Sequence, residues 1–564
     1  MKKYILGFVL IIGLTILSCS DDFTTTAAVG SLSDTSLNNP EGVNLLLTGA
    51  YSTLTGVRVN GIGNGFGVAP DSWTADVVSD DAHKGSTDDD QAELRDLEII
   101  NWGAANGYFS GRWGVLFAGV NRSNAVINLI NSIEGQDLSA QMAEARFLRG
   151  HFNFEIQRLW GNVPLITEDN ASAIEFNQPN SGPIWDAIEA DFQFAIDNLP
   201  ASQSDIGRPT LWAASAYLGK THLYQSEFNE ASAILNNVVN NGPYSLLPEY
   251  VDNFRSNGET GPEAVFAIQF VSDAGQSLNG NVGGTLNFPG GGPFGSCCGF
   301  YQPTQDLLNA FQVDENGLPL IETFNQTDVA SDFGITSAEA FTPHTGPLDP
   351  RADYTVGRRG IDYNGYGAHP GSDWIRAGFS DLSGPYLPKK NVYTASDASN
   401  VQGTGAWGQQ HSGLNFNIIR YADVLLMAAE AAAETGDLGT ALANVNAVRN
   451  RAASMTPVQA VDGSGPAANY LVNPYPSFGS QAEAVAAVRF ERRVELGMEG
   501  NRLFDLNRWG ITPQVLNEYF VNEARTIENF GQKVNSFQAF NMLWPIPQQS
   551  IDFSEDQLTQ NPGY

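Results

Sequence analysis

The chain has little cysteine, with three residues among 564, at positions 19, 297 and 298. This scarcity excludes the dense disulfide framework that stabilises small secreted domains. It also excludes a zinc site built from cysteines, because two adjacent thiols lack the further ligands of a tetrahedral ion. The six histidines, at positions 83, 151, 222, 344, 369 and 411, show no ligand spacing. We therefore expect no metal site and no cofactor.

Basic residues are also few: 29 Lys and Arg stand against 62 Asp and Glu, a net charge of −33. Phosphate binding needs clustered Lys and Arg, so we expect no nucleic-acid partner. The same deficit disfavours simple electrostatic attraction to anionic lipid. The acidic tract Asp80, Asp81 and Asp88–Asp90 is expected to be a solvated loop. Calcium binding there stays an alternative, although the ordered spacing of an EF-hand is absent.

Common catalytic signatures are missing as well. The sequence has no HExxH, GxSxG or GxxxxGKS/T pattern, which excludes the usual zinc-protease, serine-hydrolase and P-loop sites. Residues 403–408 fit GxGxxG, but no strand precedes them and no helix follows, so they do not predict a dinucleotide site. Acidic pairs are too common here to nominate a glycosidase dyad. The sequence therefore predicts a binding protein and not an enzyme.

The N-terminus indicates export. Lys2 and Lys3 precede an uncharged run, Tyr4–Leu17, which is shorter than the roughly 20 residues of a membrane-spanning helix and is typical of a signal peptide. Leu17-Ser18-Cys19 resembles a bacterial lipobox, in which Cys19 would be lipidated and anchored by its acyl chains. A simple secretory signal with an incidental cysteine is the alternative. Ser20-Asp21-Asp22 resembles the acidic tag of surface lipoproteins in the Bacteroidetes.

With Cys19 lipidated, Cys297 and Cys298 remain, and the compartment is oxidising. Neighbouring Cα atoms are about 3.8 Å apart, whereas disulfides usually span about 4.4–6.8 Å, so a bond between them is tight. We predict this vicinal disulfide and expect it to stiffen the glycine-rich loop 290–303. Two free thiols that pack in a loop of small residues are the alternative.

Apolar residues at helical spacing predict a largely helical fold. Residues 40–54 read as a helix after a tether, and Leu218, Gly219, Ala231, Leu235 and Val238 fall at tetratricopeptide spacing. Residues 421–452 repeat that pattern, and Ser480 with Glu483 predicts a capping box at the start of a further helix pair. Almost 200 loop-rich residues, from about 245 to 415, separate the two repeats. The predicted architecture is mainly α, a tetratricopeptide-like scaffold with a large irregular part.

Four long segments carry a family resemblance: EARFLRGHFNFEIQRLWGNVPLI, IIRYADVLLMAAEA, RFERRVELGMEGNRLFDLNRWG and LWPIP…LTQNPGY. In this order, and with the lipobox, they resemble the SusD/RagB family of outer-membrane nutrient-binding lipoproteins over the whole chain. The resemblance implies four tetratricopeptide-like helix pairs and an irregular second half with the ligand site. It implies a SusC-like TonB-dependent barrel as partner, and an oligosaccharide or, in some members, a peptide as ligand.

The resemblance suggests four regions along the chain. Residues 1–18 are the lipoprotein signal peptide and residues 19–35 a lipidated, flexible tether. Residues 36–245 form an N-terminal helical region. Residues 246–564 form the C-terminal region, with the irregular insertion at about 246–415 and closing helices after it.

The resemblance transfers no binding-site motif, so the candidate residues depend on chemistry alone. Sugar rings stack their C–H faces on exposed aromatic side chains, and ring hydroxyls pair with Asp, Asn or Arg. Loops 66–102 and 354–407 offer both kinds of group, and loops carry function more often than helices do. The candidates are Trp73, Asp81, Trp102, Tyr301, Tyr363, Tyr366, Trp374 and Arg376. Core packing is the alternative for any one of them.

Residues 351–390 hold six basic side chains against four acidic ones. A neutral glycan fits the overall charge, a uronic or sulfated glycan could use this patch, and structural Arg pairing is the interpretation we favour. The sequence predicts a surface-exposed, lipid-anchored protein of the outer membrane that binds oligosaccharides and delivers them to the barrel. The alternatives are a peptide-binding lipoprotein, a surface glycoside hydrolase and a structural lipoprotein without a small ligand.

Overall fold

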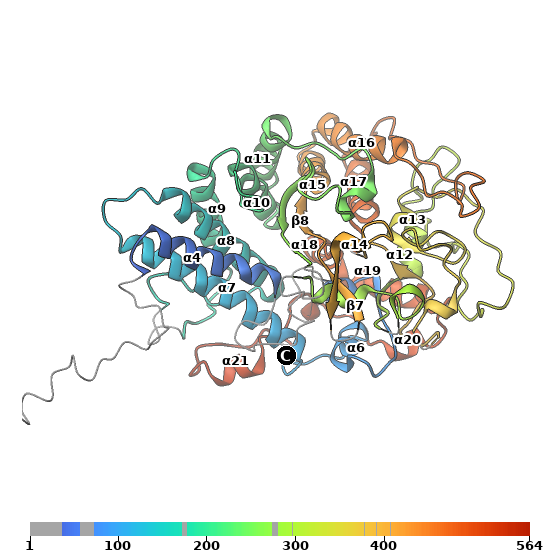
Figure 1. Ribbon diagram of the computed structural model, residues 1–564, viewed down its shortest axis with the longest axis horizontal. Coiled ribbons are helices and arrows are strands. Elements are labelled where there is room, and N and C mark those ends of the chain that lie inside the picture. Colours follow the sequence, from blue (N-terminus) through green and yellow to red (C-terminus); the bar gives the residue numbers. More distant parts are fainter. Residues whose placement is uncertain are drawn as a thin grey trace, which may run out of the picture.

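The computed structural model describes residues 37–56, 73–171, 177–272, 280–295, 297–376, 378–390, 392–405 and 408–564. Helices dominate, as the sequence predicts. The helices of the first half gather on one side of the molecule, and the loop-rich segments between residues 280 and 400 lie on the other side (Figure 1). Among the described residues, no helix combines the length and the apolar character that crossing a bilayer requires.

Six helices form the N-terminal scaffold, and side chains cap three of them; at the second helix, Asn106 accepts a hydrogen bond from the Tyr108 N–H. The side chain of Asn39 accepts a hydrogen bond from the Gly42 N–H at the first helix, and that of Thr210 accepts one from Ala213 N–H. Such caps satisfy N–H groups that have no partner within the helix. The helices are α4 (Pro40–Ser52), α7 (Gly107–Asn131), α8 (Ser139–Trp160), α9 (Trp185–Asn198), α10 (Leu211–Tyr224) and α11 (Phe228–Asn241).

The predicted repeat is the antiparallel pair α10–α11. Ala231 and Leu235 are fully buried, and a Cβ on Gly219 would lie 2.6 Å from Cγ of Leu235. The missing side chain at Gly219 therefore lets the two helices approach closely. Helix α11 also packs on α15 of the second half, where the Tyr421 hydroxyl donates to the carbonyl of Val239. The two predicted repeats, far apart in the sequence, are thus neighbours in one scaffold (Figure 1).

The C-terminal scaffold begins with the second predicted repeat, α15 (Tyr421–Glu434) and α16 (Leu438–Ser454), followed by α17 (Gln481–Leu496). Ser480 caps α17 as predicted and accepts from the Glu483 N–H, while the Glu483 carboxylate accepts from Gly479 N–H. The closing helices are α18 (Arg502–Arg508), α19 (Thr512–Glu523), α20 (Phe530–Lys533) and α21 (Gln548–Asp552). Helix α21 lies next to the N-terminal helix α7, and residues of both line one pocket (Figure 1).

Short elements make up the rest of the described chain. Its helices are α5 (Trp73–Val78), α6 (Ala92–Glu98), α12 (Gln305–Ala310), α13 (Ala352–Thr355) and α14 (Ala398–Val401), with 3-10 turns at Thr53–Thr55, Tyr250–Phe254, Gly283–Asn287, Gly292–Phe294, Ser372–Trp374 and Ala539–Met542. Its strands are β1 (Ala82–Gly85), β2 (Ala264–Ile268), β3 (Phe300–Pro303), β4 (Val356–Gly357), β5 (Leu387–Pro388), β6 (Gln402–Gly405), β7 (Gly408–Ser412) and β8 (Phe416–Arg420). They form the antiparallel pairs β1–β3, β2–β8, β4–β5 and β6–β7.

Buried ion pairs join β8 to α17 and to the residue before β2. The Arg420 guanidinium lies 2.9 Å from Glu263 Oε1, 2.5 Å from Glu495 Oε1 and 2.9 Å from Glu499 Oε2. Arg451 of α16 also contacts Glu495. Since all of these side chains are at least 95% buried, losing one charge would leave its partners buried and unpaired, at a cost of about 3–5 kcal/mol.

One expectation about the acidic tract is wrong. Asp80 and Asp81 are not solvated but 1% exposed. Asp80 Oδ1 lies 2.8 Å from Arg502 Nε, and Asp81 Oδ1 lies 3.0 Å from Arg493 Nε. Because both arginines come from the C-terminal helices, more than 400 residues later, the local sequence gave no sign of them.

Candidate functional site

Three segments that are distant in sequence meet at one end of the irregular part. Strand β1 pairs with β3 in the register His83↔Gln302, and Ser86 N–H donates to the Gly299 carbonyl over 2.6 Å. The Gly85 N–H donates to the carbonyl of Leu382 over 2.9 Å. The two loop regions nominated from the sequence, 66–102 and 354–407, are therefore brought together, with the glycine-rich loop between them.

Glycines let the loop 290–292 lie directly on the segment 373–376. A Cβ on Gly290 would overlap the Cβ of Arg376, and one on Gly292 would overlap the indole of Trp374. A Cβ on Gly291 would lie 2.5 Å from the carbonyl oxygen of Asp373. Backbone atoms of this loop therefore pack directly against the side chains of Trp374 and Arg376.

Trp374 and Tyr366 rest on a small aromatic core. Tyr363 is fully buried, donates to the Pro388 carbonyl over 2.6 Å, and lies edge-on to Trp374 with ring centroids 5.8 Å apart. Phe294 packs against Tyr366 at 4.8 Å. Both Trp374 and Tyr366 are only partly buried, so each presents part of a fixed aromatic ring to solvent.

Charged groups lie beside these rings. Arg376 Nη1 is 2.7 Å from Asp90 Oδ2 and donates to the Cys298 carbonyl over 3.3 Å. Both charged side chains remain about a third exposed, at 32% and 30%. We call Tyr366, Trp374, Arg376, Asp90 and loop 290–292 the Trp374 surface. It combines two aromatic rings with a paired hydrogen-bond donor and acceptor.

Strand β1, next to the Trp374 surface, is fixed in place by the side chains of Lys84 and His83. Lys84 Nζ donates to the carbonyls of Thr87 and Asp90 over 2.6 and 2.8 Å. Burial lowers the pKa of Lys84 to about 8, against the charges of Glu98 and Asp90. His83 is fully buried, with Nδ1 2.8 Å from Glu98 and Nε2 2.9 Å from Glu523. Burial alone would lower the pKa of His83, but the hydrogen bonds and charges of Glu523 and Glu98 raise it to about 9.

The two cysteines adjoin the Trp374 surface. Cys297 and Cys298 are joined in a disulfide, with Cys297 partly exposed and Cys298 buried. The N–H groups of Cys298 and Gly299 donate to the Phe288 carbonyl over 3.1 and 2.8 Å. The pair is therefore fixed between the aromatic core and Arg376.

Other nominated residues lie elsewhere. Asp81 is in the buried ion pairs described above, and Tyr301 is 1% exposed in the core on β3. Trp102 packs on Phe109 and donates to the Tyr564 hydroxyl over 2.8 Å, apart from the other candidates. The side chain of Trp73, together with Trp407 and Cys19, falls outside the described residues.

Two residues were missed, Asp90 on the Trp374 surface and Phe294 in the aromatic core that supports it. Asp90 was assigned to a solvated loop, and its ion pair with Arg376 spans 286 positions. Phe294 was not singled out, although it follows three glycines and a proline in a loop with aromatic neighbours. Only the excess of aromatic residues in both regions could have indicated a shared surface.

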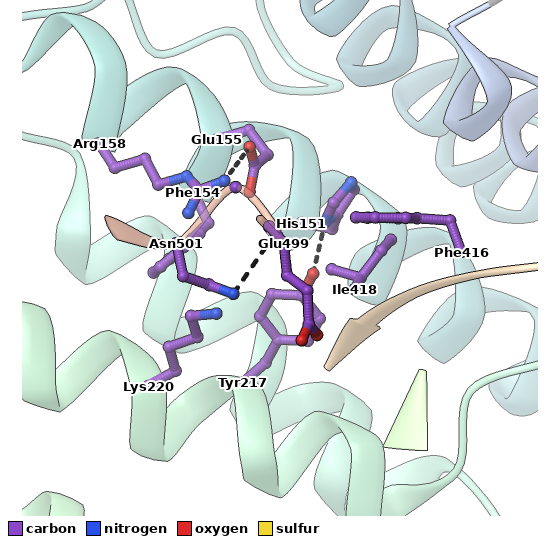
Figure 2. Close-up of a pocket in the computed structure, with 11 residues that line it drawn as sticks. His151, Phe154, Glu155, Arg158, Tyr217, Lys220, Phe416, Ile418, Glu499 and Asn501 are labelled. Atoms are coloured by element: carbon purple, nitrogen blue, oxygen red, sulfur yellow. Dashed lines mark hydrogen bonds and ion pairs between the residues drawn. The ribbon is translucent and has the colours of Figure 1, made fainter. Parts of the chain in front are cut away.

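Two other pockets are lined by polar side chains that already pair with one another. A cavity of about 20 Å³ lies between the helical scaffold and residues 499–501, where His151 points to the Tyr217 hydroxyl at 2.6 Å and Arg158 to Glu155 at 2.7 Å (Figure 2). Burial lowers the pKa of His151 to about 4. This space fits about one water molecule. A larger hollow of about 590 Å³ is lined by Phe490 and Trp509 and by four arginines, each paired with a carboxylate: Arg489, Arg493, Arg502 and Arg525.

Metal-ligand geometry is limited to one surface group among the described residues. Glu189, His222 and Glu227 bring one donor atom each within 4.8 Å of the others. His222 Nδ1 is hydrogen-bonded to Glu227 over 2.7 Å. The group lies on the helical scaffold at α9–α11, where it links neighbouring helices.

The basic side chains of residues 351–390 are mostly internal. Arg351, Arg358, Arg376 and Lys390 each pair with a carboxylate, and Arg359 donates to three main-chain carbonyls. The favoured interpretation, structural pairing, is confirmed for the four that contact a carboxylate. Lys389, like Arg359, donates only to carbonyl oxygens, and unlike Arg359 it is buried.

Comparisons with known proteins agree on one family. The model of the SusD family matches residues 262–564, and a model described as "Starch-binding associating with outer membrane" matches residues 35–223. SusD-like protein P25 of Formosa agariphila is 25% identical over 475 residues, covering 81% of this chain and 80% of its own. A SusD-like protein of Bacteroides ovatus is 26% identical over 445 residues, covering 74% and 68%.

Solved structures share the fold. A laminarin-binding SusD-like protein superposes with a TM-score of 0.66 at 22% identity, covering 93% of this chain and all of its own. Surface glycan-binding protein A from Bacteroides thetaiotaomicron, in complex with laminarihexaose, gives a TM-score of 0.64 at 19% identity, covering 93% and 99%.

Proposed function

The chain belongs to the SusD family, and from this premise we propose that it is a non-enzymatic glycan-binding protein that captures oligosaccharides at the Trp374 surface. The names of its relatives, which include laminarin-binding and surface glycan-binding proteins, support this class of ligand. The surface itself supports the place of binding.

The observation that carries the proposal is the fixed pair of exposed rings beside an ion pair. Trp374 and Tyr366 are held by Tyr363 and Phe294, so little side-chain freedom is lost when a sugar face stacks on them. Arg376 and Asp90 sit next to the rings, still about a third exposed. A guanidinium offers only donors and a carboxylate only acceptors, which together suit the hydroxyls at the edge of a sugar ring.

Affinity electrophoresis against a panel of polysaccharides, followed by calorimetry with oligosaccharides of the best binder, tests this function. Trp374→Ala should weaken binding at least tenfold, about 1.4 kcal/mol, because a few residues dominate such sites. Trp212→Ala is the matched control, since Trp212 is also partly buried but lies on the scaffold helix α10. Equal affinity of wild type and Trp374→Ala would remove this surface from the site.

A reducing-end assay separates binding from hydrolysis. If new reducing ends appear when purified protein is incubated with a bound polysaccharide, the protein is a glycoside hydrolase and the proposal fails. Binding of peptides and of no glycan would instead favour the peptide-binding alternative.

We place this activity at the cell surface, with Cys19 lipidated in the outer membrane and a SusC-like TonB-dependent barrel as the partner that receives the ligand. The description of the N-terminal family model, which names association with the outer membrane, supports the location. Affinity purification of tagged protein from detergent-solubilised outer membranes tests the partner. Recovery of the protein without any TonB-dependent barrel would contradict it.

A further inference from the structure

A groove of about 470 Å³ lies next to the Trp374 surface, on the turn 361–369. Tyr363 and Tyr366 of this turn pack on the aromatic core, while Asp362, Asn364, Gly365 and Gly367 line the groove. The other walls are Tyr354, Arg255, Lys389 and the loop 456–461. We call this space the Lys389 groove.

The cations of the groove lack close counter-ions. Lys389 is 5% exposed, and its Nζ donates only to the carbonyls of Asp353 and Asp362, over 2.5 and 2.8 Å. An ammonium has three N–H donors, so one remains for a ligand. Arg255 has only a weak contact, 4.0 Å from Asp252, and its Nε has no hydrogen-bond partner.

The carboxylates around the groove accept hydrogen bonds from groups other than Lys389. Asp353 is held by Arg358 over 2.7 Å and by the Tyr470 hydroxyl. Asp362 accepts hydrogen bonds from the Gly365 and Gly367 N–H groups over 2.8 and 3.2 Å. Two further acids lie nearby: Glu249 accepts from the Thr456 N–H and hydroxyl, and Asp252 lies 4.0 Å from Arg255. None of these carboxylates takes a hydrogen bond from Lys389, so the third N–H of Lys389 and the Nε–H of Arg255 are the donors that a ligand in the groove could use.

A buried charge without a partner is costly, and burial lowers the pKa of Lys389 to about 8, against the charges of Asp353 and Asp362. An anion in the groove would remove this cost. Tyr354 adds a partly buried ring whose hydroxyl is fixed by the Thr456 carbonyl at 2.8 Å, and Val461 adds an apolar wall that is 57% exposed.

We propose that the Lys389 groove binds an acidic sugar unit, with its carboxylate or sulfate oxygens on Lys389 and Arg255 and its ring against Tyr354. The proposal rests on the proposed function and specifies the ligand: a glycan that carries an acidic unit next to the units on the Trp374 surface. The turn 361–369 contributes to both sites, so one glycan chain can occupy them together.

Chemical labelling of Lys389 tests the groove with simple probes. At pH 8, acetic anhydride modifies the neutral amine, and mass spectrometry of peptides reports the rate at Lys389 relative to the partly exposed Lys533. Sodium glucuronate, sodium sulfate and glucose are compared at equal ionic strength. At about twice its Kd, an acidic probe that occupies the groove should slow labelling of Lys389 about threefold by mass action, and glucose should not.

Arg255→Gln supplies the matched variant, because Arg255 is 34% exposed and holds no other element in place. It should abolish the protection by the acidic probe. Arg525→Gln, a 41% exposed arginine at a different pocket, should leave it unchanged. Protection by sulfate alone would assign a sulfate ester, and protection by glucuronate alone a uronate. Protection by neither anion, or equal protection in Arg255→Gln, would overturn the proposal.

Calorimetry with whole glycans distinguishes the proposed glycan binding at the Trp374 surface from the proposed binding of an acidic unit in the Lys389 groove. Arg255→Gln should weaken an acidic oligosaccharide at least tenfold, about 1.4 kcal/mol, and leave its methyl-esterified or desulfated form unaffected. Trp374→Ala should weaken both forms. Tight binding of neutral forms with no gain from the acidic group would refute the groove and leave the proposed function standing. Binding of no glycan would refute both.

Discussion

His83 should make the stability of this protein depend on pH above neutrality. Its pKa is raised from about 6.5 in an unfolded chain to about 9 in the fold. A raised pKa adds stability that is fully present below pH 6.5 and is lost as pH rises through 9. The difference of roughly 2.5 units corresponds to about 3 kcal/mol.

Glu98→Gln is the perturbation that isolates this effect. It keeps the acceptor oxygen 2.8 Å from His83 Nδ1 and removes one of the two charges that hold the proton. Because the two carboxylates lie at nearly equal distances, the variant should lose at least half of the pH-dependent stability, about 1.5 kcal/mol. The gap in stability between wild type and variant should therefore narrow from pH 6 to pH 9.5.

Urea unfolding followed by circular dichroism at several pH values between 6 and 9.5 measures this gap. Glu434→Gln is the control: Glu434 pairs with Arg489 over 2.9 Å, and a guanidinium does not titrate in this range. Its cost should be small and independent of pH. If wild type and Glu98→Gln lose equal stability between pH 6 and pH 9.5, His83 does not hold its proton between the two carboxylates.

Three further predictions concern the anchor, the scaffold and the disulfide. Cys19→Ala should move the protein from the membrane fraction to the soluble fraction of cells that lack the barrel, and retention in the membrane would contradict the lipid anchor. Gly219→Ala should cost roughly 1–3 kcal/mol by overpacking, because its Cβ would lie 2.6 Å from Leu235 Cγ; an unchanged melting curve would count against this reasoning. Intact-mass measurement should find no alkylation at Cys297 and Cys298 without reductant and two after reduction, whereas two without reductant would exclude the bond.

The scaffold could be predicted because its signals are local. Small residues such as Gly219 and Ala231 mark a close helix contact within 13 positions, and Ser480 marks the first turn of α17. Propensity, capping and apolar spacing all act over one or two helical turns. The fold class and the two helix pairs therefore followed from the sequence.

The site could be predicted only as a region. The sequence places Tyr366, Trp374 and Arg376 in one loop region, but it gives no means to separate the buried Tyr363 from the partly exposed Tyr366. Trp102 lies in a sequence region of similar composition, but it packs on Phe109, apart from the Trp374 surface. Burial in irregular segments depends on contacts from distant residues, and these leave no periodic pattern.

The Lys389 groove was hidden for a related reason. The sequence showed six basic residues between 351 and 390, and pairing was the favoured interpretation. Which of them lacks a carboxylate depends on where acids from other segments lie. Lys389 and Lys390 are neighbours, yet only Lys390 meets Glu499, at 2.7 Å.

The long-range pairings around the Trp374 surface also constrain the order in which the protein can fold. Asp90 meets Arg376 across 286 positions, and Asp88 meets Lys533 across 445. Contacts of such separation form slowly, because the entropy of closing a long loop precedes any gain from the contact. The helix pairs can form between neighbouring segments, whereas the ion pair of Asp88 must wait for Lys533 near the end of the chain. A chain that stops before Lys533 should therefore retain its helix pairs and lack the ion pair that joins Asp88 to α20.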